Sequence, residues 1–565
     1  MVTKDVLQDE FNALFEQANA DHTNRNYEEA INKLNKAIAI NPNSAEVFNN
    51  RGLAKSLLGN EVEAIEDFNK AIAMEHDFSR AWMNRGISYF NTGDYEKAIA
   101  DLKSAVRFND TFSLAYSYLG NAYGKLNKYE EAIDSYAVAV RLEPENGTHY
   151  FNRSFFYFIT GRKEEALIDL NEALKLDDKD VDAYYNRALI YHEWDRYQEA
   201  IADYTKAIEI DTGYVSAYYN RGRAYSKLKD YEAAIADFIH TQKLVPGETS
   251  PILELGVVYD NKKDYEKAIT CYNEVLEKNP SIPEAHYNRG LALFSLWKYK
   301  EALEDFKWTI ENSPLDHEAF FYTGASSYNA GDYEAALTYY DKAISLYKND
   351  ESYFLEKGRT YNSLKNYAKA IEEFNEALKM NSQLAEAYLL RGIAHYEKEN
   401  CDLKAALTDY TEAIKIVPDY YEAYIERSYC LNKMKKAEEA ISDLKKAYSL
   451  FPTNFLSLVD IVEILFVNGK KPEAEKYLHE AIKLKWQDIQ AAIFTFFSWV
   501  FKKIDHIDAA NELAQLNDYK KNITGINYSF AEIREWLKET ALENPLWEEI
   551  TKMVNELDAL NKKTS

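Results

Sequence analysis

An alanine recurs every 34 residues along most of this 565-residue chain, in segments such as Tyr-Glu-Glu-Ala-Ile. One step is 36 residues long, and every other step is 34. The fourteen alanines are Ala30, Ala64, Ala98, Ala132, Ala166, Ala200, Ala234, Ala268, Ala302, Ala336, Ala370, Ala406, Ala440 and Ala474. Fourteen copies with a single two-residue insertion exclude chance, so the chain is an array of similar units.

Each unit reads as two helices. With the alanine placed at position 20, apolar residues recur at helical spacing over positions 1–14 and 18–31. The short connection between them, as in Gly93-Asp94, suits a tight helix–helix turn. Glycine (19) and proline (11) are scarce, which argues against a loop-rich β architecture. One such hairpin cannot bury its apolar face alone, so the units are expected to stack into a continuous solenoid.

Small residues and proline recur at fixed places in the units. Position 8 is usually glycine, position 17 tyrosine, position 27 alanine and position 32 often proline. The glycines are Gly52, Gly86, Gly120, Gly222, Gly256, Gly290, Gly324, Gly358 and Gly392. This pattern resembles the tetratricopeptide-repeat (TPR) family. The resemblance implies an all-α fold, a right-handed superhelical α-solenoid of about 14 TPR helix hairpins, with the first helices lining a concave groove.

The pattern sets the expected domain boundaries. Residues 1–10 are a lead-in, and 489–565 hold a degenerate helix pair and a C-terminal helical cap, with helices over 489–520, 526–541 and 545–562. A docking module marked by Trp536 and Trp547 is the alternative for this tail. Between them, the array over 11–488 divides into repeats 1 to 14: 11–44, 45–78, 79–112, 113–146, 147–180, 181–214, 215–248, 249–282, 283–316, 317–350, 351–384, 385–420, 421–454 and 455–488.

Positions 7 and 23 of the repeats vary together. An arginine at 7 comes with an aspartate at 23, and several repeats lack both charges. A partly buried charge without a partner is costly, so a salt bridge between the two helices of each such repeat is predicted. The pairs are Arg51 with Asp67, Arg85 with Asp101, Arg153 with Asp169, Arg187 with Asp203, Arg221 with Asp237, Arg289 with Asp305, Lys357 with Glu373, Arg391 with Asp409, and Arg427 with Asp443. Surface charges copied by duplication are the alternative.

Position 6 is often asparagine, and in the family this position faces the groove. A carboxamide both donates and accepts hydrogen bonds, so a row of them could hold the backbone of an extended peptide. The row, Asn50, Asn84, Asn152, Asn186, Asn220 and Asn288, resembles the asparagine ladder of O-linked GlcNAc transferases. Hydrogen bonds to neighbouring helices are the alternative.

Aromatic and aliphatic side chains form a second candidate binding feature. Phe151, Phe155 and Phe158 in repeat 5 lie at helical spacing, as do Tyr287, Leu291 and Phe294 in repeat 9 and Met83, Ile87 and Phe90 in repeat 3. Such a stripe is often core. Because positions 4, 8 and 11 already carry the packing, these side chains are predicted to anchor a partner.

A carboxylate clamp for chaperone C-termini is not expected. Asn121 and Asn152 fit part of that pattern, but Ser117, Asp182 and Asn186 stand where cations or other residues are required.

Several other function classes are disfavoured. A net charge of −26 disfavours binding to nucleic acids and to anionic membranes. Cys271, Cys401 and Cys430 follow no metal-binding spacing, and no nucleotide-binding or hydrolase motif occurs. His192 and His395 are expected to be satisfied or solvated. No signal peptide or transmembrane segment is seen, which favours a cytoplasmic protein.

These observations predict a non-catalytic protein–protein interaction scaffold without a cofactor, binding a peptide-like segment of a partner in the groove. Two alternatives remain open. One is a structural or assembly subunit that wraps a folded partner or self-associates, and the other is the recruitment subunit of a separate enzyme.

Overall fold

The structure is a computed structural model. It describes residues 4–452, 454–484, 488–505, 507–522, 533–534, 537–538 and 545–561. Helices account for all the regular secondary structure in these ranges, and none of these residues lies in a strand. The all-α solenoid of helix hairpins is therefore confirmed. The chain divides into two compact units, Met1–Pro280 and Ser281–Ser565.

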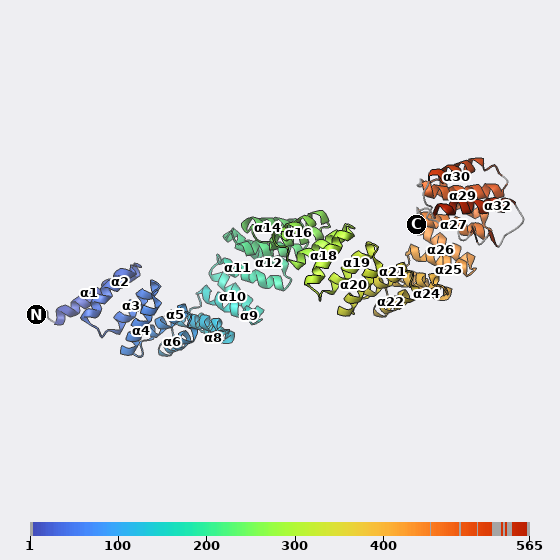
Figure 1. Cartoon of the computed structure of the whole chain (residues 1–565). Helices are drawn as coiled ribbons and strands as arrows, with labels where there is room; N and C mark the ends of the chain where they lie inside the picture. The colour runs from blue at the N-terminus through green and yellow to red at the C-terminus, as the bar shows by residue number, and fades with distance from the viewer. Residues whose placement is uncertain are drawn as a thin grey trace. The chain divides into compact units, whose positions relative to one another are not determined.

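The first unit contains eight hairpins, repeats 1 to 8 (Figure 1). Its helices are α1 Lys4–Thr23, α2 Tyr27–Ile40, α3 Ala45–Leu57, α4 Glu61–Met74, α5 Ser79–Asn91, α6 Tyr95–Phe108, α7 Ser113–Lys125, α8 Tyr129–Leu142, α9 Gly147–Ile159, α10 Lys163–Leu176, α11 Val181–Glu193, α12 Tyr197–Ile210, α13 Val215–Lys227, α14 Tyr231–Leu244, α15 Ser250–Asn261 and α16 Tyr265–Lys278.

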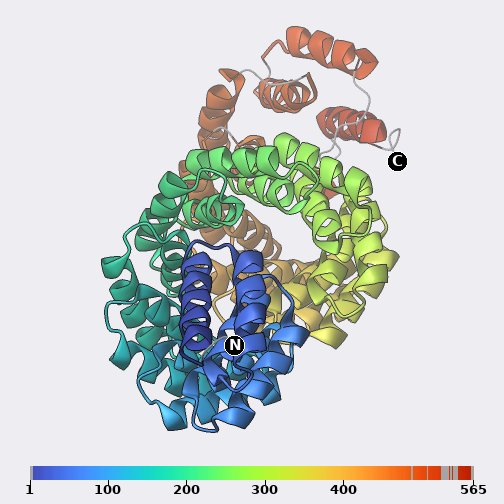
Figure 2. The same cartoon turned by 90° about the vertical axis from the view of Figure 1, so that its left-hand side faces the viewer.

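The second unit continues the array and then departs from it. Its helices are α17 Pro283–Ser295, α18 Tyr299–Asn312, α19 His317–Asn329, α20 Tyr333–Leu346, α21 Glu351–Ser363, α22 Tyr367–Met380, α23 Ala385–Glu397, α24 Leu403–Ile416, α25 Tyr421–Lys433, α26 Ala437–Leu450, α27 Phe455–Val467, α28 Lys471–Ile482, α29 Asp488–Ile504, α30 Ala510–Asn522 and α32 Pro545–Asn561. The turned view in Figure 2 shows consecutive hairpins side by side within each unit.

The helix bounds agree with the 34-residue period except at the N-terminus. Helix α1 begins at Lys4, so most of the predicted 1–10 lead-in belongs to the first helix. The reason is local: residues 4–10 contain neither proline nor glycine, and nothing there stops the helix from extending.

The turn inside each hairpin except that of repeat 12, which carries the two-residue insertion, contains a residue in the left-handed conformation at position 15. Glycine meets this requirement in repeat 3, where Gly93 has a φ of 83°. Backbone N–H groups after the helix satisfy its last carbonyls, as in Asp94 N to Tyr89 O at 2.9 Å. Other repeats place a bulkier residue at position 15, and Trp297 adopts a φ of 63° there.

The glycine at position 8 allows the two helices of a hairpin to touch. A Cβ atom on Gly120 of α7 would lie 2.5 Å from the ring of Tyr136 on α8, closer than any real contact. The same arrangement holds at Gly256 and Tyr272 and at Gly392 and Tyr410. The ring at position 24 therefore fills the space that the glycine leaves, and these rings form the core between the helices.

The tail packs on repeat 14. Phe494 and Phe501 of α29 contact Phe455 and Phe466 of α27, with ring centroids 5.5 and 5.0 Å apart. Phe494, Phe497, Val500 and Phe501 of α29 thus share one core with repeat 14. Met553, Val554 and Leu557 of α32 join the same core. The predicted helix over 526–541 and Trp536 lie almost wholly outside the described residues, as does the side chain of Trp547.

The tail also reaches the first-helix face of repeat 14. The backbone N–H of Ile533 donates to Oε1 of Glu463 at 3.1 Å, and both residues are buried. Glu463 occupies position 9, which the family resemblance assigns to the groove. At this last repeat the position is therefore already taken by the chain itself.

Candidate partner-binding site

The predicted charge pairs are in contact in the structure. In each of the six arginine pairs from Arg51 to Arg289, Nε and a terminal nitrogen donate to the two carboxylate oxygens over 2.6 to 2.9 Å. The aspartates are at most 6% exposed. Arg391, Arg427 and Lys357 make the corresponding contacts. The pairs join the first helix to the second and so serve the hairpin rather than a ligand.

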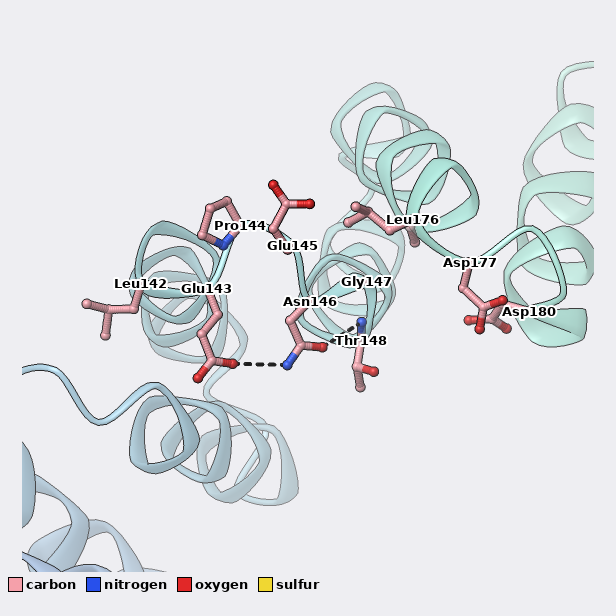
Figure 3. A pocket seen from close by; sticks show the side chains of 11 residues that line it. Leu142, Glu143, Pro144, Glu145, Asn146, Gly147, Thr148, Leu176, Asp177 and Asp180 are labelled. Atoms are coloured by element: carbon pink, nitrogen blue, oxygen red, sulfur yellow. Dashed lines mark hydrogen bonds between the residues drawn. The ribbon is translucent and has the colours of Figure 1, made fainter.

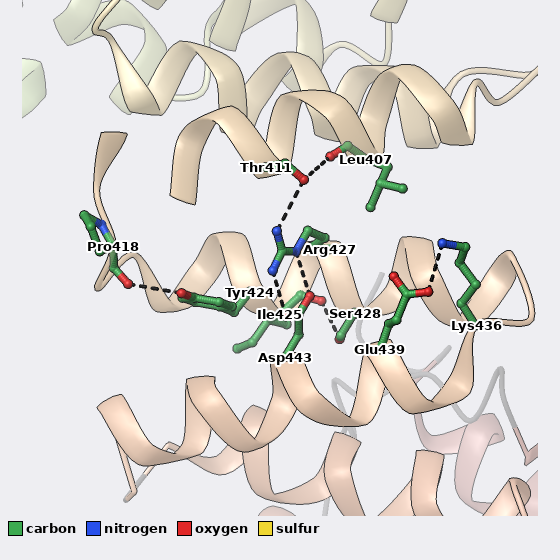
Figure 4. Close-up of polar contacts among 10 residues, drawn as sticks. All are labelled: Leu407, Thr411, Pro418, Tyr424, Ile425, Arg427, Ser428, Lys436, Glu439 and Asp443. Carbon is green, nitrogen blue, oxygen red and sulfur yellow. Dashed lines mark hydrogen bonds and ion pairs between the residues drawn. The ribbon is translucent and has the colours of Figure 1, made fainter. Parts of the chain in front are cut away.

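The same cations also reach back to the preceding repeat, a contact that the sequence interpretation missed. Arg427 of α25 lies between Asp443 of its own hairpin and Thr411 of the hairpin before (Figure 4). The partner always stands at position 25, 16 residues before the cation. The contacts, 2.5 to 3.3 Å long, are Arg51 to Asn35, Arg85 to Asn69, Arg187 to Asn171, Arg221 to Thr205, Lys357 to Asp341, Arg391 to Asn375 and Arg427 to Thr411.

The pKa shifts of Asp67 and Asp169 have opposite directions. Burial raises the pKa of Asp67, but hydrogen bonds from Arg51 and Lys55 outweigh it and hold the pKa below its usual value. Burial also raises the pKa of Asp169, where Arg153 is the one cation that offsets it, and there the pKa stays above its usual value.

The asparagine row has two kinds of members. Asn50 donates to Asn19 at 2.9 Å, Asn84 to Asn49 at 2.9 Å, and Asn220 to the hydroxyl of Tyr185 at 2.9 Å. These three join neighbouring first helices, and Asn84 is buried. Asn84 therefore offers no amide to a ligand. By contrast, Asn152, Asn186 and Asn288 are partly exposed and make no side-chain hydrogen bond to another described residue.

A small apolar pocket lies between the first helices of repeats 5 and 6. Its volume is about 160 Å³, and it brings together residues of three helices. Phe155 and Phe158 come from α9, Leu189 and Asn186 from α11, and Leu170 from α10 below. Phe155 is 50% exposed, whereas Phe158 is partly buried. The structure thus brings two of the predicted aromatic residues and one predicted asparagine to one cavity.

Two further apolar side chains on first helices of this unit are exposed. Leu114 of α7 and Ile159 of α9 are 50% and 43% exposed. Phe151, predicted as an anchor, is instead partly buried in the core between α9, α10 and α11. Leu189 and Leu170 were not singled out from the sequence; Leu170 occupies the core position 24 of its repeat, whereas Leu189 occupies position 9.

The predicted aromatic anchors of repeat 9 pack among other rings. The Tyr287 hydroxyl donates to Glu318 at 3.1 Å, and its ring contacts Phe306 and Tyr322. Burial, and then the charge of Glu318, raise the pKa of Tyr287 above its usual value. Phe294 lies 5.9 Å from Tyr322. Both predicted residues are partly buried, so they offer less free surface than Phe155.

A larger cavity of about 650 Å³ opens where α8 turns into α9 and α10 into α11 (Figure 3). Glu143, Glu145, Asp177 and Asp180 line it, and none of the predicted binding residues does. Hydrogen bonds from Asn146 and then His149 hold the pKa of Glu143 below its usual value. This acidic cavity belongs to the turns between repeats and not to the first-helix face.

Two histidines differ from the expectation that they would be satisfied or solvated. The Nδ1 atoms of His192 and His395 are buried and have no hydrogen-bond partner among the described residues. Burial lowers the pKa of both. In the described part of the chain, no group of three or more His, Cys, Asp or Glu residues could hold a metal ion. Within the same ranges, no helix is long and apolar enough to cross a membrane.

The chain is similar to two curated proteins over short stretches. It is 40% identical over 75 residues to a protein named DnaJ homolog subfamily C member 7 homolog from Dictyostelium discoideum, over 13% of each chain. It is 26% identical over 106 residues to small glutamine-rich tetratricopeptide repeat-containing protein 2 of Saccharomyces cerevisiae. That match covers 19% of this chain and 31% of the relative, so the chain spans less than a third of either relative's length.

Among solved structures, the chain is similar to Cut9-Hcn1, described as an APC/C hetero-tetramer. The identity is 14% and the TM-score 0.36, with 80% of this chain and 96% of that chain covered.

Models of the tetratricopeptide repeat match most of the chain. The models described as "Tetratricopeptide repeat" match residues 45–77, 79–112, 113–146, 181–213, 203–236, 296–351 and 421–454. The model described as "TPR repeat" matches residues 18–59, 156–194, 256–296 and 358–399. These matches run through both compact units and fall on the hairpins described above. The chain belongs to the tetratricopeptide-repeat family.

Proposed function

We propose that this chain is a protein–protein interaction scaffold that holds a peptide-like segment of a partner on the first-helix face of repeats 5 and 6. The pocket of Phe155, Phe158 and Leu189 is the observation that carries the proposal. The TPR fold is typical of proteins that bind other proteins. The occupant we assign is one apolar side chain of the partner segment, inserted between α9 and α11.

The size of the pocket suits that occupant. A dry apolar cavity of roughly 150 Å³ accommodates a benzene-sized group. The pocket holds about 160 Å³, is lined mainly by apolar side chains and is open to solvent on the side of Phe155. Covering the exposed half of Phe155 would contribute about 1 kcal/mol to binding, with a similar gain from the inserted side chain.

Asn186 supplies the polar contact that such a site needs. It lines the pocket and has no side-chain partner among the described residues. Its carboxamide can donate to a carbonyl and accept from an N–H of an extended segment at the same time. Asn152, one repeat earlier and also without such a partner, would hold the next stretch of backbone.

Random dodecapeptides displayed on phage and selected on the full chain test this proposal. We expect the enriched peptides to share an apolar residue, and F155A to weaken their binding about tenfold. The matched control is I168A, because Ile168 of α10 is 62% exposed and does not line the pocket. Circular dichroism of both variants checks that they fold alike.

Two results would count against the proposal. Equal losses in F155A and I168A would mean that the pocket is not the binding site. Failure to enrich any peptide would favour the alternative, an assembly subunit that wraps a folded partner.

A further inference from the structure

We propose that the segment held at this pocket also carries an aspartate or glutamate, which binds to Arg223 and Lys227 on α13 in repeat 7. This inference rests on the proposed function and names the chemistry of the partner. The pocket and the two cations lie on the first helices of consecutive repeats, α9, α11 and α13.

The two cations share one exposed face of α13. Arg223 and Lys227 are four residues apart, so their side chains are neighbours on the helix, and both are exposed. Two like charges at this spacing repel each other and destabilise a helix. An anion bound between them would remove the repulsion.

Neighbouring carboxylates of the chain leave the side chains of Arg223 and Lys227 largely available to a ligand. The Arg223 Nε lies 3.5 Å from Oε1 of Glu254, too long for a good hydrogen bond, and the Arg223 side chain is 44% exposed. Lys227 makes no ion pair with another described residue. Glu254 shows that a carboxylate can approach the guanidinium from the next repeat, and a second carboxylate would find Lys227 free.

Two buried polar atoms near the cations have no hydrogen-bond partner among the described residues. His192 of α11 stands one turn beyond Leu189 of the pocket, and burial lowers its pKa first, with Arg223 and Lys227 adding to the shift. Its Nδ1 is buried without a partner, and so is the hydroxyl of the fully buried Tyr204 beneath, whose ring centroid lies 6.3 Å from that of His192.

The spacing sets where the acidic residue falls in the segment. Leu189 and Arg223 both occupy position 9 of their repeats, 34 residues apart. Packed helices lie roughly 10 Å apart, and an extended chain advances about 3.3 Å per residue. The carboxylate should therefore stand two to four residues from the apolar side chain that fills the pocket.

The same phage selection tests the inference when two libraries are used. In one the random dodecapeptide is internal, and in the other it ends in a free C-terminus. The full chain is compared with R223E/K227E and with K179E/K243E, a control with the same change in net charge at two other exposed lysines of the first unit. Lys179 lies in the turn before α11 and Lys243 on α14, and neither lines the pocket.

The native chain should enrich peptides from the internal library with an acidic residue two to four positions from the apolar one. R223E/K227E should bind these peptides about tenfold more weakly and should itself select a basic residue at that place. K179E/K243E should bind them within twofold of the native chain. The preference for the apolar residue should survive in all three proteins.

Four outcomes would overturn the inference. One is that apolar peptides bind in a Phe155-dependent way without any acidic preference, which would leave the proposed function standing. A second is that both charge variants lose equal affinity, which would show a general charge effect. A third is enrichment only in the free C-terminal library, which would replace the side-chain carboxylate by a terminal one. A fourth is that no peptide is enriched, which would overturn the proposed function as well.

Discussion

Replacing Arg221 by methionine should loosen two repeats, because its guanidinium donates three hydrogen bonds to two side chains, one in each repeat. It donates twice to Asp237, over 2.8 and 2.7 Å, and once to Thr205 of the preceding hairpin over 3.0 Å. The Asp237 carboxylate is 5% exposed, so the methionine variant leaves it buried without its cation.

The magnitude follows from the burial of Asp237. Leaving one member of a buried ion pair alone costs about 3 kcal/mol, whereas replacing both members with apolar residues of similar size costs far less, about 1 kcal/mol or below. The double variant R221M/D237L should therefore be more stable than R221M. T205V removes only the hydrogen bond between repeats and should cost about 1 kcal/mol. In the R221M background the same change should cost almost nothing.

Hydrogen exchange measured by mass spectrometry is the appropriate assay. A stacked array opens locally, so one melting temperature for the whole chain does not report on repeat 7. Peptides covering α13 and α14 report the free energy of opening that hairpin. A loss of about 3 kcal/mol appears as exchange roughly 150-fold faster, provided that reclosing outpaces exchange.

Equal exchange in R221M and R221M/D237L would refute the reasoning, because no penalty would then attach to the isolated carboxylate. A T205V effect that is unchanged by R221M would show that the hydroxyl does not act through the guanidinium.

Two further predictions concern backbone and charge. W297G should raise the free energy of opening of α17 and α18, measured by hydrogen exchange, by about 0.5 kcal/mol, because Trp297 is left-handed and 79% exposed. G331A at the same position should lower that of α19 and α20 by about 1 kcal/mol. Burial and then the charge of Glu397 raise the pKa of Glu426 to about 7. The pKa of Glu426 is therefore higher in the folded chain than in the unfolded chain. The folded chain loses stability as the pH rises from the unfolded-state pKa of Glu426 to about 7. E426Q should thus stabilise the chain by about 1–3 kcal/mol at pH 8 but not at pH 4, and E399Q at neither.

The sequence was enough to predict the architecture because its main signal is periodic. Internal copies served as an alignment, so the joint variation of positions 7 and 23 identified pairs such as Arg85 and Asp101 before any coordinates. The hydrogen bond from position 7 to position 25 of the preceding repeat also has a periodic sequence pattern, since asparagine or threonine often precedes the arginine by 16 residues. Comparison within single repeats could not find it, because its two ends belong to different repeats.

The binding face was less predictable because it depends on the gaps between side chains. Asn84 and Asn186 share a position, but Asn84 meets Asn49 of the preceding helix and is buried, whereas Asn186 lines a pocket. Whether a cavity forms beside Phe155 depends on the sizes of Leu189 and Leu170, which come from two other helices. No periodic pattern records that combination.

The hydrogen bonds of the arginines at position 7 also indicate where this chain tolerates an insertion. Arg391 keeps its 16-residue spacing to Asn375, whereas its distance along the chain to Asp409 has grown to 18, and both contacts remain. The two added residues are absorbed in the loop before Asp402, which still caps α24. A tag or an inserted domain is therefore best placed between Lys398 and Asp402, where growth of the loop leaves the neighbouring hairpins in register.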